Sequence, residues 1–195
     1  MAKKVDHEER KREIAMKAMA LFSKVGFDNV TLGMIASATG IARTVLYRYF
    51  STKRDVLDAA IHEGTKRIME KCAPIVASKA SAAKRLEAVC HTTSEVFFEN
   101  KDFLIAVYDY AVSQVRIGVD VTERVALRTA GIRNIFRELL SEGRKRGEFS
   151  RSLDVAKVSD MLFSYLESAT MRLVLNTERT PKAVKARFSA LINSL

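Results

Sequence analysis

The sequence contains few of the residues that cross-link chains or interrupt helices, with two cysteines and two prolines among 195 residues. Cys72 and Cys90 form no C-x-x-C pattern, which argues against a disulfide framework or a zinc site and favours two buried thiols in a reducing compartment. Pro74 and Pro181 each lie near the edge of a periodic apolar segment, so both are predicted to mark helix boundaries. Two-residue alternation of apolar and polar positions is absent, and no strand is predicted.

Long uncharged apolar runs are missing as well. A membrane-spanning helix needs about 20 consecutive apolar residues, whereas the run Val107–Val115 is short and contains Asp109. The N-terminal segment is charged throughout Glu9–Glu13, where a signal peptide would have its apolar region. The sequence therefore predicts a cytoplasmic protein.

Catalytic and metal-binding signatures are equally scarce, with three histidines in the whole chain. No G-x-S-x-G, H-E-x-x-H or phosphate-binding glycine loop is found. Glu87, His91 and Glu95 share one helix face at a spacing that suits a metal ion, but a solvated or salt-bridged face explains the pattern better. We predict no catalytic residue, no cofactor and no metal site, and hence no enzyme.

The chain is rich in apolar residues and in positive charge. The apolar content of 48% is enough for one large domain or for two that share a core. A formal net charge of +10 favours a polyanionic partner, either nucleic acid or an anionic membrane surface. Residues 1–54 hold eleven Lys or Arg against five Asp or Glu, so the excess of positive charge is expected at the N-terminal end.

Apolar residues recur at helical spacing along the chain, which predicts an all-α fold of about nine helices. Gly26 is suited to end the first helix, and Thr31 is placed to cap the second. The predicted helices are Asp6–Val25, Thr31–Ala38, Ala42–Phe50, Lys53–Cys72, Ala80–Asn100, Asp102–Val115, Val121–Arg146, Val155–Asn176 and Pro181–Ser194.

The second and third predicted helices flank a short turn at Gly40, which is typical of a helix-turn-helix. If Leu46 and Phe50 face the core, the opposite face of the third helix is polar. That face carries Arg43, Thr44, Tyr47 and Arg48. In a DNA major groove, arginine pairs with guanine and tyrosine reaches phosphate. A solvated surface would explain an arbitrary helix of this kind, but Lys53 and Arg54 just beyond it favour DNA binding.

The segment FDNVTLGMIASATGIARTVLYRYFSTKRDVL, residues 27–57, resembles the N-terminal signature of the TetR family of transcriptional repressors. The shared features are a Thr that opens the second helix, an I-A-x-x-A/T-G-I/V turn and an L-Y-x-Y/H-F ending of the recognition helix. The resemblance implies that Thr31, Tyr49 and Lys53 contact phosphates. It also implies that Arg43, Thr44, Val45 and Tyr47 line the groove.

Two positions depart from the family pattern. Ala42 stands where a serine cap is frequent, and Gly33 stands where many members have a polar or basic residue that reads bases. Base reading is therefore expected to depend mainly on the third helix. The basic residues near the N-terminus are equally consistent with DNA phosphate contacts and with a solvated end. They are Lys3, Lys4, Arg10, Lys11 and Arg12.

The resemblance further implies a three-helix DNA-binding domain at residues 1–52 and a helical domain for ligand binding and dimerisation at residues 53–195. The last two predicted helices either cover the core of their own domain or, as the resemblance implies, pair with their copies in a dimer. The interface residues predicted there are Met161, Tyr165, Ala169, Phe188, Leu191 and Ile192.

A ligand cavity needs an apolar lining with a few polar anchors. The candidate lining residues are Met69, Phe97, Phe98, Phe103, Tyr108, Arg128, Arg133 and Tyr165, most of which are equally expected in an ordinary core. Two functions are consistent with these features. The first is a homodimeric repressor that binds a palindromic DNA operator and is released by a small molecule. The alternative is an all-α metabolite-binding protein or enzyme whose basic surface binds an anion such as an acyl-coenzyme A.

Overall fold

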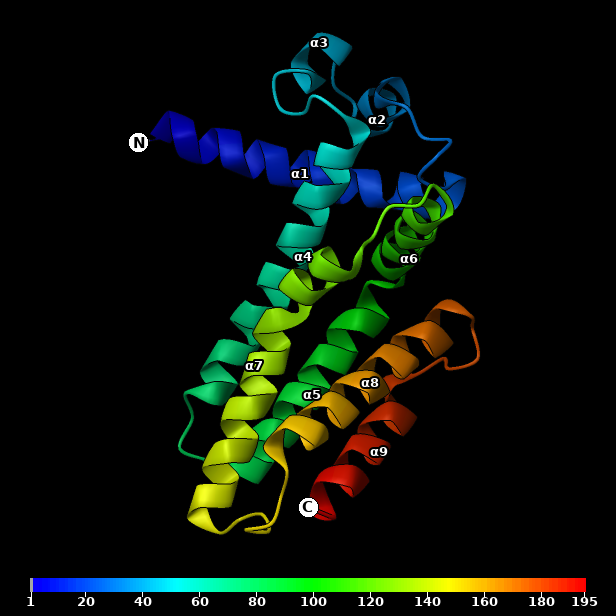
Figure 1. Cartoon of the computed structure of the whole chain (residues 1–195). Helices are drawn as coiled ribbons and strands as arrows, with labels where there is room; N and C mark the ends of the chain where they lie inside the picture. Colours follow the sequence, from blue (N-terminus) through cyan, green and yellow to red (C-terminus); the bar gives the residue numbers. More distant parts are fainter. Residues whose placement is uncertain (1) are drawn as a thin grey trace. The chain divides into compact units, whose positions relative to one another are not determined.

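The computed structural model describes the backbone of residues 2–195 and the side chains of residues 7–195. Within these residues it contains nine α-helices and no strand, which confirms the predicted all-α class (Figure 1). The helices are α1 Ala2–Val25, α2 Leu32–Thr39, α3 Arg43–Leu46, α4 Lys53–Val76, α5 Ala82–Glu99, α6 Lys101–Arg116, α7 Thr122–Arg146, α8 Val155–Val174 and α9 Pro181–Asn193. None of them is long and apolar enough to cross a membrane.

The chain packs as two compact units that do not follow the order of the sequence. Unit 1 comprises Met1–Lys66 and Asp102–Arg124, and unit 2 comprises Arg67–Lys101 and Val125–Leu195. Helix α6 therefore packs with the helix-turn-helix, and α4 passes from one unit into the other. This division differs from the predicted boundary between residues 52 and 53.

The core of unit 1 is built by α1, α2, α3, α6 and the first part of α4. Ile35 of α2 and Leu46 of α3 are fully buried, and Phe50 is nearly so, as the apolar pattern predicts. Both predicted caps are confirmed, because Gly26 follows the end of α1 in the left-handed region, with φ of 84°, and the Thr31 side chain accepts a hydrogen bond from the Met34 N–H. Gly40 ends α2 in the same region, with φ of 72°. These caps set the turn that orients α3.

Helix α6 is attached to the turn between α1 and α2. The Phe27 N–H donates to Asp109 Oδ2 at 2.6 Å, and the Phe27 ring packs edge-on against Tyr110. Farther along, Ser113 Oγ donates to Asp28 Oδ1 at 3.1 Å. On the α4 side, the Phe103 ring lies only 2.7 Å from where a Cβ at residue 64 would be, so a side chain there would require the ring to shift. Helix α6 thus belongs structurally to the same unit as the helix-turn-helix.

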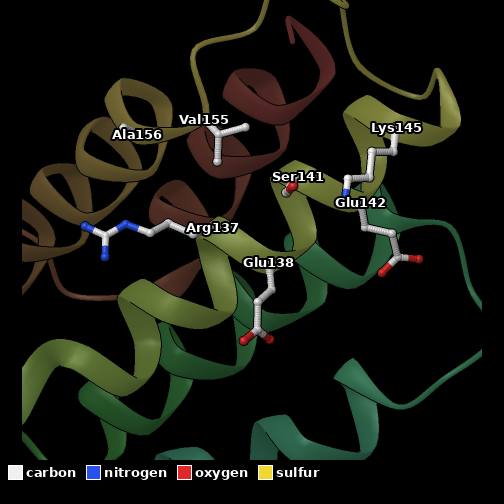
Figure 2. Close-up of a pocket in the computed structure, with 7 residues that line it drawn as sticks. All are labelled: Arg137, Glu138, Ser141, Glu142, Lys145, Val155 and Ala156. Carbon is white, nitrogen blue, oxygen red and sulfur yellow. The ribbon is translucent and has the colours of Figure 1, made fainter.

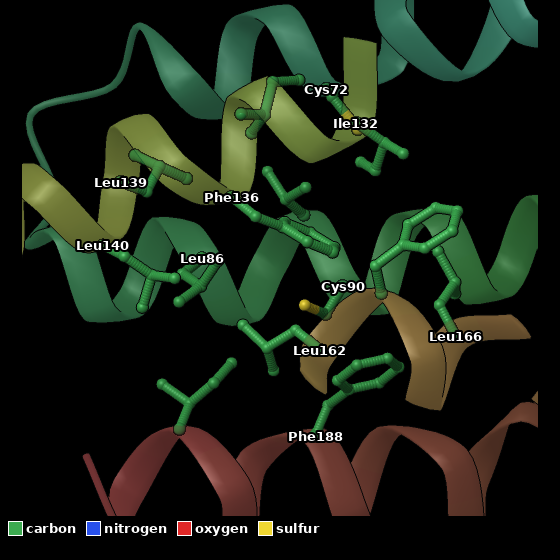
Figure 3. Packing of buried hydrophobic residues seen from close by; sticks show 14 of the residues in the cluster. Cys72, Leu86, Cys90, Ile132, Phe136, Leu139, Leu140, Leu162, Leu166 and Phe188 are labelled. Carbon is green, nitrogen blue, oxygen red and sulfur yellow. The ribbon is translucent and has the colours of Figure 1, made fainter. Parts of the chain in front are cut away.

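The core of unit 2 lies between α5, α7, α8, α9 and the second part of α4. Phe136 of α7 lies at its centre, with Leu86 and Cys90 of α5 beside it and Phe188 of α9 on the far side (Figure 3). Both cysteines are buried and unlinked, and burial raises the pKa of each thiol. They are therefore packing residues in their neutral form, as predicted.

The helix boundaries differ from the prediction by a few residues. Pro181 is the first residue of α9, as expected, but Pro74 lies inside the last turn of α4, which continues to Val76. The missing Pro74 N–H removes a single hydrogen bond close to the helix end, so the final residues of α4 still form.

Candidate nucleic-acid interface

Helix α3 is shorter than predicted. Its α-helical part is the four residues Arg43–Leu46, followed by turns in which Arg48 N–H bonds to the Val45 carbonyl and Tyr49 N–H to that of Leu46. These are bonds between residues three apart, the tighter pattern that is common at helix ends. Ala42 at the N-cap supplies no side-chain hydrogen bond, which weakens the start of the helix. The polar face is consequently compact.

The four side chains predicted to face outward are all exposed. Arg43, Thr44 and Arg48 are exposed, and Tyr47 is 54% exposed, whereas Val45 and Tyr49 are half-buried. An exposed tyrosine between two arginines combines a large planar group with two guanidinium groups. This composition suits base edges and phosphates.

Thr31 is exposed at the start of α2. Its Oγ1 accepts the Met34 N–H at 3.2 Å, which leaves the hydroxyl hydrogen able to donate. A phosphate oxygen is a suitable acceptor for that hydrogen, so the capping role and the implied phosphate contact are compatible.

Lys53 has a structural role that the sequence did not indicate. Its Nζ donates to the carbonyl oxygens of Phe27 at 2.7 Å and Asp28 at 2.8 Å, and it lies 4.6 Å from the centre of the Phe27 ring. An ammonium group has three N–H donors. Two of them hold the turn before α2, and one remains for a phosphate.

Replacing Lys53 by Met should therefore lower stability as well as DNA affinity. Hydrogen bonds from charged groups contribute about 1.5–3 kcal/mol, so we expect a loss in that range by thermal or chemical unfolding, together with weaker binding to every duplex. Arg54→Met is the matched control, because Arg54 makes an i,i+4 pair with Asp58 at 3.6 Å and is 40% exposed. Such pairs contribute about 0.3–0.5 kcal/mol. Equal stability losses in the two variants would contradict the structural role.

One neighbour of the candidate interface was not predicted. The exposed His7 ring lies 4.6 Å from the Tyr49 ring, centre to centre. Lys11 Nζ lies 5.6 Å from the centre of the Phe50 ring. No local sequence signal could identify these pairs, because they depend on how α1 crosses the end of α3. The side chains of Lys3 and Lys4 lie outside the described residues.

The other N-terminal basic residues are engaged within the protein. Arg10 pairs with Glu13 at 2.9 Å, and Arg12 with Glu63 of α4 at 3.4 Å. These exposed pairs still leave guanidinium donors for a phosphate. The expectation of a contact from this segment stays open.

The residues predicted to line a ligand cavity are divided between the units. Phe103 and Tyr108 belong to unit 1, and the other six belong to unit 2. In unit 2, Arg133 pairs with Asp160 at 2.9 Å and its guanidinium carbon lies 3.7 Å from the centre of the Phe163 ring. Met69 lies against Gly131, and Phe97 and Phe98 are half-buried against the core.

A surface depression of about 610 Å³ lies elsewhere in unit 2, between α7 and the start of α8 (Figure 2). It contains none of the predicted cavity residues. Its lining is Arg137, Glu138, Ser141, Glu142, Lys145, Val155 and Ala156. Two acidic and two basic side chains around an apolar floor favour no particular ligand charge.

The predicted dimer residues fall into two groups. Ala169, Phe188 and Ile192 are buried in the core of unit 2, at 3%, 0% and 4% exposure, because the apolar stripes of α8 and α9 face α5. A surface that contacts a partner cannot be built from them. Met161 is 59% exposed, and Tyr165 and Leu191 are half-buried at the edge of the core.

His91 and Glu95 connect α5 to α9 by polar contacts, and Glu87 Oε1 lies 4.0 Å from His91 Nε2 within α5. His91 Nε2 lies 3.1 Å from both the Lys185 carbonyl oxygen and Ser189 Oγ, and Glu95 pairs with the Lys185 ammonium. Among the described residues no group of three His, Cys, Asp or Glu side chains is placed to hold a metal ion. These contacts are those of a salt-bridged helix face.

The surplus of positive charge in residues 1–54 is largely offset within unit 1, because that unit also contains residues 55–66 and Asp102–Arg124. Unit 1 contains 14 Lys or Arg and 12 Asp or Glu, so its net charge is only about +2. Unit 2 contains 19 Lys or Arg and 11 Asp or Glu, which leaves about +8. The acidic residues of α6 and of the loop that follows it offset the basic N-terminal helices. Within unit 1, residues 43–54 still carry four Lys or Arg and no Asp or Glu.

A capped helix-turn-helix with an exposed polar recognition helix, joined to a second all-helical unit, is typical of a DNA-binding regulator. Comparison with known families agrees. The model of "Bacterial regulatory proteins, tetR family" matches residues 14–60, and that of "YsiA-like protein, C-terminal region" matches residues 57–192. The chain belongs to the tetR family and is a ligand-responsive, DNA-binding transcriptional regulator.

Named relatives cover most of the chain. It is 23% identical over 173 residues to the fatty acid metabolism regulator protein of Bacillus subtilis, covering 86% of this chain and 84% of the relative. It is 29% identical over 146 residues to the repressor KstR2 of Rhodococcus jostii, covering 75% of this chain and 71% of KstR2. The crystal structure of FadR from Bacillus subtilis in complex with stearoyl-CoA has the same fold, with a TM-score of 0.77 and 22% identity. The match covers 92% of this chain and 96% of FadR.

Proposed function

We propose that the protein is a cytoplasmic homodimeric repressor that binds a palindromic operator through α3 and is released by a long-chain acyl-coenzyme A. The observation that carries the DNA part is the exposure of Arg43, Thr44, Tyr47 and Arg48 on one short, capped helix. Arginine to guanine is the commonest specific contact in a major groove. Thr31 and the remaining Lys53 donor supply phosphate contacts that fix the position of α3.

The proposed dimer face is the exposed side of α8. Its residues recur at alternating spacings of three and four, as in a helix-pairing stripe. They are Met161, Ser164, Ser168, Met171 and Leu175, of which the two Met and the Leu are 59%, 42% and 62% exposed. On α9 the exposed small residues Ala186 and Ala190 permit close approach of a second helix. A dimer of this kind suits two recognition helices about 34 Å apart on one face of DNA.

The effector class is supported by charge and by relatives. An acyl-coenzyme A combines several phosphate charges with a long apolar chain, and unit 2 combines a net charge of about +8 with a large apolar core. One relative is named as a fatty acid metabolism regulator, and one structural neighbour was solved with stearoyl-CoA.

Selection of bound sequences from a random duplex pool tests the DNA part. We expect a palindrome with half-sites about 10 base pairs apart, and binding that weakens steeply with salt because several phosphates are neutralised. The alternative, a metabolite-binding protein with a basic surface, predicts no enriched sequence and a weak salt dependence. Either result decides between the two functions.

Release by an acyl-coenzyme A is tested with three matched compounds, stearoyl-CoA, free stearate and coenzyme A. We expect stearoyl-CoA to release labelled operator at a concentration at least about tenfold lower than either fragment, because only the thioester combines the phosphates with the chain. Fluorescence anisotropy of the operator measures the release. If stearate acts as well as the thioester, the effector is a carboxylate, and if none acts the proposed class is wrong.

A further inference from the structure

Arg43 and Gly33 contact each other across the helix-turn-helix. Gly33 is the second residue of α2, and Arg43 is the first residue of α3. A Cβ at residue 33 would lie 2.9 Å from Arg43 Nη2 and 3.1 Å from both Cζ and Nε. The guanidinium group therefore occupies the space that any side chain at residue 33 would enter.

The backbone does not require glycine at this position. Gly33 is helical, unlike Gly40, whose φ of 72° strongly favours glycine. Glycine lowers helix stability relative to alanine. The contact with Arg43 is the feature of the described structure that a larger residue would change, and the group displaced would be the mobile end of a long side chain.

We propose that Gly33 is a specificity-determining residue of the operator contact, because it sets where the Arg43 guanidinium is presented. This inference rests on the proposed binding of DNA through α3. A bidentate contact with guanine requires the guanidinium plane in one position and orientation. A side chain at residue 33 would push the guanidinium away from α2 and change the base pair that it reaches.

The test compares operator selection and binding for wild type, Gly33→Ala, Arg43→Ala and the double variant. Arg43→Ala should relax one position in each half-site, with a loss of discrimination of about 5- to 150-fold. Gly33→Ala should alter preference at that same position while the melting temperature stays equal to wild type or rises. In the Arg43→Ala background, Gly33→Ala should have no further effect on preference.

Two results would overturn the inference while leaving DNA binding intact. One is a Gly33→Ala variant that selects the wild-type operator with wild-type affinity. The other is a Gly33→Ala effect of the same size with and without Arg43, which would mean that residue 33 acts independently. By contrast, failure of the wild-type protein to select any palindrome would reject the proposed function itself.

Discussion

Ser164→Arg is expected to convert the protein into a monomer and to lower operator affinity by at least about 100-fold. Ser164 is exposed in the middle of the proposed α8 stripe, so the substitution should change the stability of a single chain by no more than about 0.5 kcal/mol. In a dimer the new guanidinium would be buried without a partner, which costs several kcal/mol. Linked half-sites commonly bind 10²- to 10⁴-fold more tightly than separate ones, and that gain would be lost.

Light scattering at tens of micromolar should then give a mass near 21.8 kDa for the variant and twice that for wild type. Ser78→Arg, the same change in the exposed loop after α4, should leave both mass and affinity unchanged. Phe188→Leu tests a core position instead of the proposed interface, since Phe188 is fully buried. This substitution should lower the melting temperature while the dimer persists. A dimeric Ser164→Arg variant would place the interface elsewhere.

The dimer residues illustrate which parts of the structure follow from sequence. The apolar stripes of α8 and α9 correctly predict two amphipathic helices, yet the most apolar face is the one that packs on α5. Phe188 and Ile192 were predicted to meet a partner and instead lie in the core of unit 2. The face that we propose for pairing with a second copy is partly polar and contains small residues, such as Ser164 and Ser168. Hydrophobic periodicity alone therefore identifies the face of each helix that packs on the core of its own chain, not the face that is available to a second copy.

Contacts between residues close in the sequence were easier to predict than contacts between distant residues. Thr31 and Gly40 were predictable because a cap depends on a few neighbouring residues. The roles of Lys53 and Asp109 were not, because both bind the turn at Phe27, from positions 26 and 82 residues away. The Arg43–Gly33 contact likewise depends on the angle between α2 and α3. The contacts of Asp109 hold α6 in unit 1, and the acidic residues of Asp102–Arg124 lower the net charge of that unit.

Operator DNA and effector should weaken each other's binding by the same factor, about 5- to 150-fold for a coupling free energy of 1–3 kcal/mol. Unit 1 is joined to unit 2 by three chain crossings, within α4 after Lys66, before Asp102 and after Arg124. Helix α4 spans about 36 Å at 1.5 Å per residue and is one connection. Helix α6 is a second, because Asp109 and Tyr110 hold it to the turn that orients α2.

Asp109→Ala should therefore reduce the coupling factor towards one while effector affinity without DNA stays at the wild-type value. The lost charge-assisted hydrogen bond should also cost about 1.5–3 kcal/mol of stability. Asp102→Ala is the control on the same helix, since Asp102 accepts an exposed hydrogen bond from Ser23 Oγ at 3.2 Å. Calorimetric titration of stearoyl-CoA with and without operator measures the factor in each variant. If Asp109→Ala retains the wild-type coupling factor, the coupling is carried by α4. If the wild-type protein binds stearoyl-CoA equally well with and without operator, effector and operator bind independently.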